Sequence, residues 1–366
     1  MCKEDEKWMK RCIRIARNGA AGAPPNPMVG AVLVCDGLIV GEGYHVRCGG
    51  PHAEVNAVAS VRDRSLLRRS TLYVSLEPCA HYGKTPPCAE LIVREGIPRV
   101  VVGCVDPFAK VLGRGIEMLR QAGIEVVTGV CEAECRALNR CFFTFHKYRR
   151  PYVTLKWAQS ADGYLDRRRT GGVPERLSTP WTSLDVHRMR ARNGAILVGG
   201  RTVVLDNPSL TTRLWPGPNP LRVVLDDSCG SFPDGLRLWD GSAPTWVVCG
   251  MQAKEVYAKR LPEWVDYVVP EGGESPLEAL MNRLYGAGVQ SLLVEGGSRT
   301  LQRFADAGLW DEARVEVAAR VLGDGIPAPV LPAGTIARVE NHWAGVSVLH
   351  YVRPGSEGAA LIGPSE

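Results

Sequence analysis

The sequence predicts an α/β protein of two domains, and three observations lead to this prediction. Its 366 residues correspond to about two domains at ~100–200 residues each. Stretches with the composition of buried strands alternate with stretches of helical periodicity, a pattern typical of a sheet with helices packed on its faces. The alternation stops near residue 150, where Pro151 follows a basic helical stretch, and then restarts.

The first half is predicted to form a domain over residues 1–148. It begins with an amphipathic helix at 4–18 and a Pro-rich loop around residue 26, and it ends with one long helix at 131–151. The strands predicted between these points are 29–35, 71–76, 99–105 and 124–129, and the helices are 52–61, 88–96 and 115–123.

The second half is predicted to form a domain over residues 149–355, followed by a flexible tail at 356–366 that is rich in Gly, Ser and Ala. The predicted strands are 151–158, 195–200, 221–227, 245–250, 264–269 and 291–297, with a helix at 276–286 before the last of them.

The composition excludes several classes of protein. With 45% hydrophobic and 23% charged residues and a mean hydropathy of −0.07, the chain is neither disordered nor a coiled coil. Its longest uncharged stretch, 18–35, is broken by Pro and Gly, and its N-terminus lacks the apolar run of a signal peptide. We therefore expect a cytoplasmic protein without a membrane segment, in which the 12 cysteines are buried thiols and metal ligands.

The charge is unevenly distributed between the halves. Residues 1–150 contain 22 Lys and Arg against 15 Asp and Glu, whereas residues 151–366 contain 22 against 24. A positive first half suits a phosphorylated small molecule as well as a nucleic acid, so the charge does not decide between these two ligands.

One pattern in the first half points to a metal site. His52, Cys79 and Cys88 would give zinc three protein ligands and leave the fourth position to water, which is the arrangement of catalytic zinc. Glu54, two residues after the histidine, can take a proton from that water and pass it to a leaving group. This H-x-E…P-C…C pattern is that of zinc deaminases that act on nucleobases.

The pattern on its own leaves alternatives open. Single cysteines are commonly packing residues, and a fourth ligand from Cys48, His81 or Cys104 would make the zinc structural. The common deaminase spacing is also shorter (Cys-x-x-Cys), whereas here eight residues, AHYGKTPP, separate the two cysteines.

Three segments of the first half resemble the deaminase domain of the bifunctional riboflavin-biosynthesis deaminase–reductases: NPMVG at 26–30, GYHVRCGGPHAE at 43–54 and EPCAHYGKTPPC at 77–88. Members of that family share the long cysteine spacing. The resemblance implies a cytidine-deaminase-like three-layer α/β/α domain with zinc bound by His52, Cys79 and Cys88 and protons transferred by Glu54. It also implies substrate contacts from Asn26, His45, Lys84 and Asp106, close to a departure from the family pattern at Phe108, where asparagine is frequent.

The second half is similar to the reductase domain of the same family, which has a dihydrofolate-reductase-like α/β fold. The similar segments are PYVTLKWAQSADG at 151–163, LSTP at 177–180, DVHRMRA at 185–191, AILVGGRTVVLDNPSLTTR at 195–213 and VEGG at 294–297. The chain lacks the GxGxxG pattern of a Rossmann site. The backbone N–H groups after VEGG lie at the start of a predicted helix, and next to glycine no side chain shields them. They could therefore bind the pyrophosphate of a cofactor.

The resemblance implies two sets of residues in the reductase domain. NADPH is expected at Ala158, Thr202, Asp206, Gly297, Ser298 and Arg299. The substrate is expected at Lys156, Ser178, Arg190, Leu210, Arg213 and Glu295. Arg176 stands where family members often have an aromatic residue, and the arginine run at 167–169 is interpreted as a solvated loop.

The resemblance thus predicts a bifunctional enzyme of riboflavin biosynthesis. It would deaminate 2,5-diamino-6-ribosylamino-4(3H)-pyrimidinone 5′-phosphate with zinc and then reduce the ribosyl group with NADPH, giving 5-amino-6-(5-phosphoribitylamino)uracil. We expect the protein to be a homo-oligomer. Its expected ligand is this phosphorylated pyrimidine, and we expect it to bind neither nucleic acid nor a membrane. The competing hypotheses are a deaminase that edits RNA, a module with structural zinc, and a deaminase whose second half serves only folding or assembly.

Overall fold

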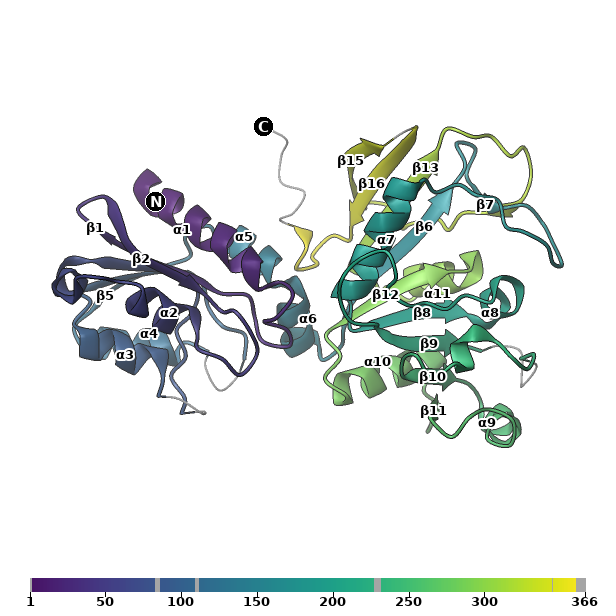
Figure 1. Cartoon of the computed structure of the whole chain (residues 1–366), viewed down its shortest axis with the longest axis horizontal. Coiled ribbons are helices and arrows are strands. Elements are labelled where there is room, and N and C mark those ends of the chain that lie inside the picture. The colour runs from purple at the N-terminus through teal and green to yellow at the C-terminus, as the bar shows by residue number, and fades with distance from the viewer. Residues whose placement is uncertain (1, 83–85, 109–111, 227–231, 344, 360–366) are drawn as a thin grey trace. The chain divides into compact units, whose positions relative to one another are not determined.

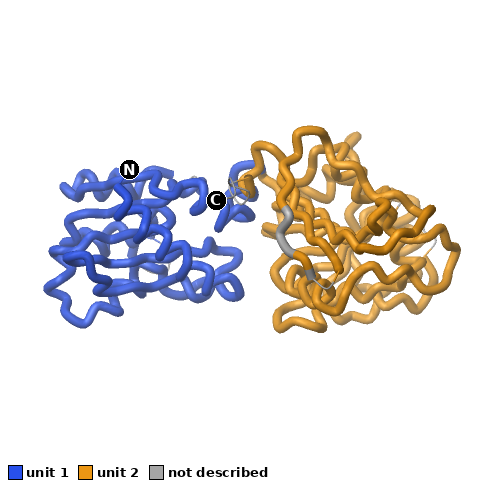
Figure 2. Tube along the Cα trace, turned by 90° about the horizontal axis from the view of Figure 1, so that it is seen from above, with its two compact units in different colours: residues 1–148 blue, residues 149–366 orange. Residues whose placement is uncertain are grey.

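The chain divides into two compact units, Met1–Tyr148 and Arg149–Glu366, shown in Figures 1 and 2. In this computed structural model, residues 2–82, 86–108, 112–226, 232–343 and 345–359 are described, without the side chains of 339–341 and 343. Within these ranges no helix combines the length and the apolar character needed to cross a membrane. Each unit is described by itself.

The first unit is built on a five-stranded sheet in the order β2-β1-β3-β4-β5. β1 is antiparallel to β2 and β3, and the remaining pairs are parallel. The strands are β1 (Gly30–Cys35), β2 (Leu38–Tyr44), β3 (Thr71–Leu76), β4 (Arg99–Cys104) and β5 (Glu125–Thr128). The helices are α1 (Lys3–Ala16), α2 (Ala53–Ala59), α3 (Cys88–Glu95), α4 (Arg114–Gln121), α5 (Glu132–Leu138) and α6 (Arg140–Tyr148), with short 3-10 turns at Arg17–Gly19 and Arg64–Arg69.

Side chains that alternate along β1 form two separate cores. Leu33 packs with α2, α3 and α4 on one face of the sheet, whereas Val32 and Val34 pack with α1, α5 and α6 on the other. Figure 1 shows α1 and α5 on the opposite side of this sheet from α2, α3 and α4. The expected three-layer α/β/α architecture is confirmed.

The sequence analysis missed one strand of this unit and misjudged one helix. β2 follows β1 through a two-residue turn at Asp36 and Gly37, both with positive φ (50° and 77°), which is the Asp-Gly hairpin signal. The helix predicted at 131–151 is two helices, because the chain leaves the helical path at Asn139. The Asn139 side chain accepts a hydrogen bond from the Met28 N–H and donates one to the Met28 carbonyl, both at 2.8 Å.

The second unit contains a nine-stranded sheet in the order β11-β10-β9-β8-β12-β6-β13-β16-β15. All neighbours from β11 to β13 are parallel, and β16 and β15 join antiparallel. The strands are β6 (Tyr152–Gln159), β8 (Ala195–Gly199), β9 (Leu221–Leu225), β10 (Thr245–Val248), β11 (Val265–Val268), β12 (Ser291–Gly296), β13 (Glu312–Ala318), β15 (Ile336–Trp343) and β16 (Val346–Val352). A separate small sheet pairs β7 (Tyr164–Asp166) with β14 (Ile326–Pro327).

Helices cover both faces of this sheet. The helices are α7 (Pro180–Arg192), α8 (Gly200–Asp206), α9 (Met251–Tyr257), α10 (Pro276–Gly286) and α11 (Ser298–Asp306), with a 3-10 turn at Arg237–Trp239. Leu280 of α10 and Phe304 of α11 pack on one face, and Val203 of α8 and Tyr257 of α9 pack on the other. The predicted α/β class therefore holds for this unit as well.

The segment predicted as a tail starts with an ordered stretch. The Ser356 N–H donates to the Arg353 carbonyl and the Ala359 N–H donates to the Ser356 carbonyl, both at 3.1 Å, and Ser356 and Glu357 are buried. Residues 360–366 lie outside the described part of the chain.

The close approach of α4 to the chain after β3 gives a test of this packing. A Cβ on Gly115 would lie 1.9 Å from the Pro78 carbonyl oxygen. We expect Gly115→Ala to destabilise the first unit by about 1–3 kcal/mol, because backbone must move to admit the methyl group. Calorimetric melting measures the effect. The control is Gly286→Ala in α10, where nothing lies within 4 Å of the new Cβ. If both variants melt like the wild type, the approach is looser than described.

Candidate active sites

The three proposed metal ligands come together at the edge of the first sheet. His52 immediately precedes α2, Cys79 follows β3, and Cys88 is the first residue of α3. The His52 Nδ1 atom lies 3.5 Å from the Cys79 Sγ and 3.3 Å from the Cys88 Sγ. The ligand atoms of these three side chains all lie within 4.8 Å of one another, close enough to bind one metal ion. Within the described ranges, no other His, Cys, Asp or Glu side chains form such a cluster, which we call the metal group.

The alternative fourth ligands lie outside this group. Cys48 is exposed, and His81 is exposed on the loop between the two cysteines. The buried Cys104 thiol donates to the Ser75 carbonyl at 3.3 Å. The described part of the chain therefore offers three ligands, which matches the open coordination of catalytic zinc rather than the closed coordination of a structural site.

The chemistry of the donors fits zinc. One imidazole and two sulfurs form a ligand set that zinc accepts. A hydrogen bond from the Cys88 thiol, together with contacts from His52 and the Cys88 N–H at 3.3 Å, lowers the pKa of Cys79 well below its ordinary value despite its burial. The Cys79 sulfur is thus held as the thiolate that a metal requires.

Glu54 is placed as a buried carboxyl beside this group. It is the second residue of α2 and only 3% exposed. Burial raises the pKa of Glu54 to about 7, and the nearby His52 opposes this shift only in part. A carboxyl with a pKa near 7 exchanges a proton readily at neutral pH, as a general acid–base group must.

Asn26 and His45 lie on the histidine side of the metal group. The His45 and His52 rings are 5.4 Å apart and edge to face. The Asn26 amide lies 3.2 Å from the His45 Nε2, and the His45 Nδ1 lies 3.0 Å from the Pro51 carbonyl. Since the carbonyl only accepts, Nδ1 carries the proton and Nε2 accepts from Asn26. Burial lowers the pKa of His45, which keeps the ring neutral.

Asp106 lies on the cysteine side, after β4. Burial raises the pKa of Asp106 to about 6, against the hydrogen bond that it accepts from the Phe108 N–H at 2.8 Å. The Phe108 ring contacts His146, with ring centres 5.1 Å apart. Lys84, also predicted to bind substrate, lies outside the described residues.

Glu77 is a residue of this site that the sequence analysis did not identify. Its buried carboxylate accepts hydrogen bonds from the N–H groups of Asp106 (3.2 Å), Gly113 (3.0 Å) and Gly115 (2.9 Å). It thereby ties the start of α4 and the Asp106 loop to the chain just before Cys79. The sequence did contain a signal for Glu77, because it lies two residues before the predicted zinc ligand Cys79 in the triplet Glu-Pro-Cys.

In the second unit, two predicted substrate residues are bonded to each other. Arg190 of α7 donates to both Glu295 oxygens, at 2.9 and 2.6 Å, and to the Thr211 carbonyl at 3.2 Å. The Arg213 N–H donates to His187 Nδ1 at 2.9 Å, and its guanidinium donates to the Thr211 hydroxyl at 2.9 Å. Burial and the charges of Arg190 and Arg213 lower the pKa of His187 to about 4, so it is a neutral acceptor.

His187 was also missed by the sequence analysis, although it precedes Arg190 by three positions and therefore lies on the same side of a helix. Lys156 and Ser178 both contact a second missed residue, Glu316 of β13. The Lys156 Nζ and the Ser178 hydroxyl lie 2.9 Å and 2.6 Å from its two carboxylate oxygens.

Leu210, also predicted to contact the substrate, has a left-handed backbone (φ 54°), and its side chain is buried in the core.

The predicted cofactor residues are distributed over three elements. Thr202 lies at the start of α8, and its Oγ1 is 3.1 Å from where a Cβ on Gly297 would lie. Gly297 has φ 67° and precedes α11, so only glycine fits this turn without strain. The Ser298 hydroxyl donates to the Pro327 carbonyl at 2.6 Å, and Arg299 is exposed.

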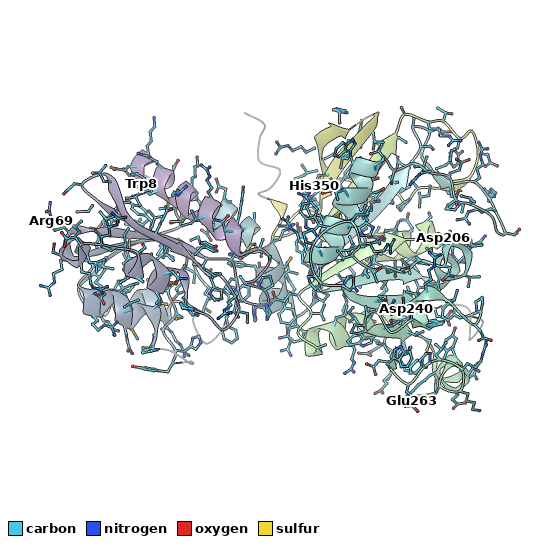
Figure 3. The ribbon with its side chains drawn as sticks, viewed as in Figure 1. Trp8, Arg69, Asp206, Asp240, Glu263 and His350 are labelled. Atoms are coloured by element: carbon cyan, nitrogen blue, oxygen red, sulfur yellow. The ribbon has the colours of Figure 1, made fainter. Side chains whose placement is uncertain are left out.

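Two further predicted cofactor residues lie at or near the C-terminal ends of their elements. Ala158 lies near the end of β6 and is partly buried. Asp206, labelled in Figure 3, ends α8 and is bonded to Arg169, which also binds Asp166 at 2.6 Å. The arginine run was therefore only partly a solvated loop: Arg169 is mostly buried against two carboxylates, whereas the side chains of Arg167 and Arg168 are more than half exposed.

Two family models match the chain. The model of the cytidine and deoxycytidylate deaminase zinc-binding region matches residues 2–104, and the model of the RibD C-terminal domain matches residues 151–348. The riboflavin biosynthesis protein RibD of Aquifex aeolicus is 40% identical over 324 residues, which cover 88% of this chain and 89% of the relative. The chain belongs to the RibD family.

Other RibD proteins agree with this assignment. RibD of Escherichia coli is 36% identical and covers 87% of this chain and 89% of its own. The structure of the Thermotoga maritima diaminohydroxyphosphoribosylaminopyrimidine deaminase/5-amino-6-(5-phosphoribosylamino)uracil reductase is 35% identical, with a TM-score of 0.84 over 95% of this chain and 98% of that chain. Acinetobacter baumannii RibD is 30% identical, with a TM-score of 0.80 over 96% and 99%.

Membership of the RibD family confirms the predicted general function. This chain has a zinc-binding deaminase domain and a reductase domain, and it is a bifunctional enzyme of riboflavin biosynthesis. The first unit contains the metal group, and the second contains the Arg190–Glu295 pair.

The metal group leads to a direct test. Cys79→Ser is expected to weaken zinc binding by more than about 100-fold, since a change in an outer contact of a metal ligand already costs about 10–100-fold. Cys48→Ser, which changes an exposed cysteine outside the group, should keep the wild-type affinity. Competition with a chelator measures both. Equal zinc affinity of C79S and wild type would show that Cys79 is not a ligand.

Proposed function

We propose that this chain performs two successive reactions. It first deaminates 2,5-diamino-6-ribosylamino-4(3H)-pyrimidinone 5′-phosphate and then reduces the ribosyl group with NADPH, giving 5-amino-6-(5-phosphoribitylamino)uracil. The observation that supports this most is the three-ligand group beside the buried Glu54. The similar Thermotoga maritima protein is named for the same two activities.

In the deamination, His52, Cys79 and Cys88 hold zinc and Glu54 moves the protons. When bound, zinc lowers the pKa of a water molecule towards ~7. Glu54 takes a proton from the water that attacks the ring carbon carrying the amine. It passes this proton to the neighbouring ring nitrogen. It then transfers the remaining hydroxyl proton of the adduct to the amine nitrogen, which leaves as ammonia while the ring carbonyl forms. A carboxyl whose pKa lies near 7 suits both transfers.

The residues around this centre would hold the pyrimidine. His45 contacts the ring of the metal ligand His52, and Asn26 lies next to His45. Asp106 is close enough to Cys79 for the charge of Cys79 to raise the pKa of Asp106. The neutral His45, with its proton fixed on Nδ1, uses its Nε2 as an acceptor, so the amide orientation of Asn26 is fixed as well. Lys84 is proposed to contact the substrate from the loop between the cysteines.

In the reduction, a hydride from NADPH adds to C1′ of the opened ribosyl group and a proton adds to its nitrogen. NADPH would supply only the hydride. Lys156, Ser178, Arg190, Leu210, Arg213 and Glu295 are proposed to surround the substrate. Because Glu295 and the Thr211 carbonyl already occupy the Arg190 guanidinium, we assign the substrate phosphate to Arg213, which is exposed and bonded through one nitrogen to Thr211.

The cofactor is proposed to lie along α8 and the start of α11. The N–H groups that begin α11 after Gly297 suit a pyrophosphate. Thr202, Ser298 and Arg299 border this turn, and Ala158 and Asp206 are proposed to lie near the nicotinamide and its ribose. We further propose that the enzyme is a cytoplasmic homo-oligomer. The RNA-editing hypothesis is disfavoured, because it gives the reductase domain no role.

Replacement of Glu54 tests the deamination. Glu54→Gln is expected to reduce ammonia release about 10²–10⁴-fold, because an amide does not accept the proton. Zinc content and the reduction of already deaminated substrate should stay at wild-type levels. Glu90→Gln, which changes a half-buried carboxylate bonded to the Tyr82 hydroxyl, is the control. Wild-type ammonia release by E54Q would eliminate Glu54 as the proton carrier.

Replacement of Arg213 tests the phosphate assignment. Arg213→Gln is expected to raise the KM for the deaminated substrate about 10- to 100-fold with little change in kcat, since a hydrogen bond to a charged group contributes about 1.5–3 kcal/mol. NADPH absorbance provides the rates. Arg260→Gln, at a surface ion pair with Asp234, should match the wild type. The assignment fails if R213Q retains the wild-type KM.

A further inference from the structure

Two neighbouring strands of the reductase unit carry charge on one face only. Leu155 of β6 and Val315 of β13 face the hydrophobic core under α10 and α11. Lys156 follows Leu155, and Arg314 and Glu316 flank Val315, so all three belong to the opposite face, where they are also buried. In the parallel register, Arg314 pairs with Lys156 and Glu316 pairs with Ala158.

Glu316 uses both of its oxygens on residues assigned above to the substrate. Its Oε1 lies 2.9 Å from the Lys156 Nζ, and its Oε2 accepts from the Ser178 hydroxyl at 2.6 Å. Its side chain is only 2% exposed. Burial raises the pKa of Glu316, but Lys156, Ser178 and Thr182 outweigh this and bring it below its ordinary value. Glu316 is therefore a buried anion.

The other charges on this face already have partners. Arg190 binds both oxygens of Glu295 on β12, the strand on the other side of β6. Asp185 of α7 lies 2.5 Å from the Arg314 guanidinium and also binds Arg188. Glu316 is thus the carboxylate in direct contact with the Lys156 ammonium.

We propose that Glu316 is a positioning residue of the reductase site, which fixes the Lys156 ammonium and the Ser178 hydroxyl for the substrate. This inference rests on the proposed function. Because Ser178 donates its proton to Glu316, its oxygen faces the substrate only as an acceptor. Lys156 keeps further N–H groups as donors. The pair therefore selects a substrate with a hydroxyl or N–H donor next to an acceptor oxygen, as a sugar or pyrimidinedione offers.

The test is a double-mutant cycle on binding of the deaminated substrate, measured by titration calorimetry in the full chain without NADPH. Glu316→Gln and Lys156→Met are each expected to weaken binding about 10-fold. The double variant should bind no more than about twofold more weakly than K156M, because residues that act as a unit are not additive. Additive losses would indicate a structural effect of Glu316 that does not act through Lys156, and would overturn the proposal.

The same strand offers a matched control. Glu312 is buried on β13 and accepts hydrogen bonds from the hydroxyls of Tyr152 (3.0 Å) and Thr154 (2.9 Å). Glu312→Gln removes a comparable buried charge, but it should keep the substrate affinity within about twofold of wild type. Equal weakening by E312Q and E316Q would overturn the proposal.

A second variant keeps the proposal falsifiable if E316Q does not fold. Ser178→Ala leaves Glu316 and Lys156 in place, and it should weaken binding about 10-fold through loss of the acceptor. Unchanged affinity of S178A would overturn the proposal on its own. A wild-type chain that neither binds nor reduces the deaminated compound would instead contradict the proposed function. Wild-type binding and reduction combined with unchanged affinity of E316Q would contradict only the role of Glu316.

Discussion

Buried carboxyl groups are the constraint around which both sites are organised. An ionised carboxylate that leaves water must either gain a compensating partner or shift its pKa and take up a proton. In the deaminase unit, burial of Glu54 is opposed only in part by the nearby His52, and the pKa of Glu54 rises to about 7. In the reductase unit, burial of Glu295 is opposed by the Arg190 guanidinium, which brings its pKa below the ordinary value.

These two ways of burying a carboxyl group, protonated near pH 7 or ionised and paired with a cation, correspond to different chemistry. A carboxyl that is half protonated near neutral pH is suited to moving protons, as hydrolytic removal of an amine requires. Carboxylates that remain charged and bound to Arg190 and Lys156 instead hold donors in fixed positions. This suits a reduction in which the cofactor supplies the hydride and the protein supplies orientation.

The parallel strands bring these groups together. Cys79 follows β3 and Asp106 follows β4, and these strands are parallel neighbours whose last residues, Leu76 and Cys104, are paired. Glu295 likewise lies near the end of β12, which runs parallel to β6 and β8. Residues at carboxyl ends of parallel strands share one edge of the sheet, where ligands of α/β proteins bind. The Glu77 carboxylate then fixes the loop of Asp106 and the start of α4 to this edge.

The sequence by itself determined the α/β alternation, because periodicity records which side of each element is buried. It also determined the metal group, because the types and order of His52, Cys79 and Cys88 already restrict the chemistry. Only the tertiary structure decided which charges meet. Arg190 and Glu295 lie 105 positions apart and Ser178 and Glu316 lie 138 apart, so their contacts depend on strand order and register. The break at Asn139 has the same cause, since its partner Met28 lies 111 positions away and is invisible to local periodicity.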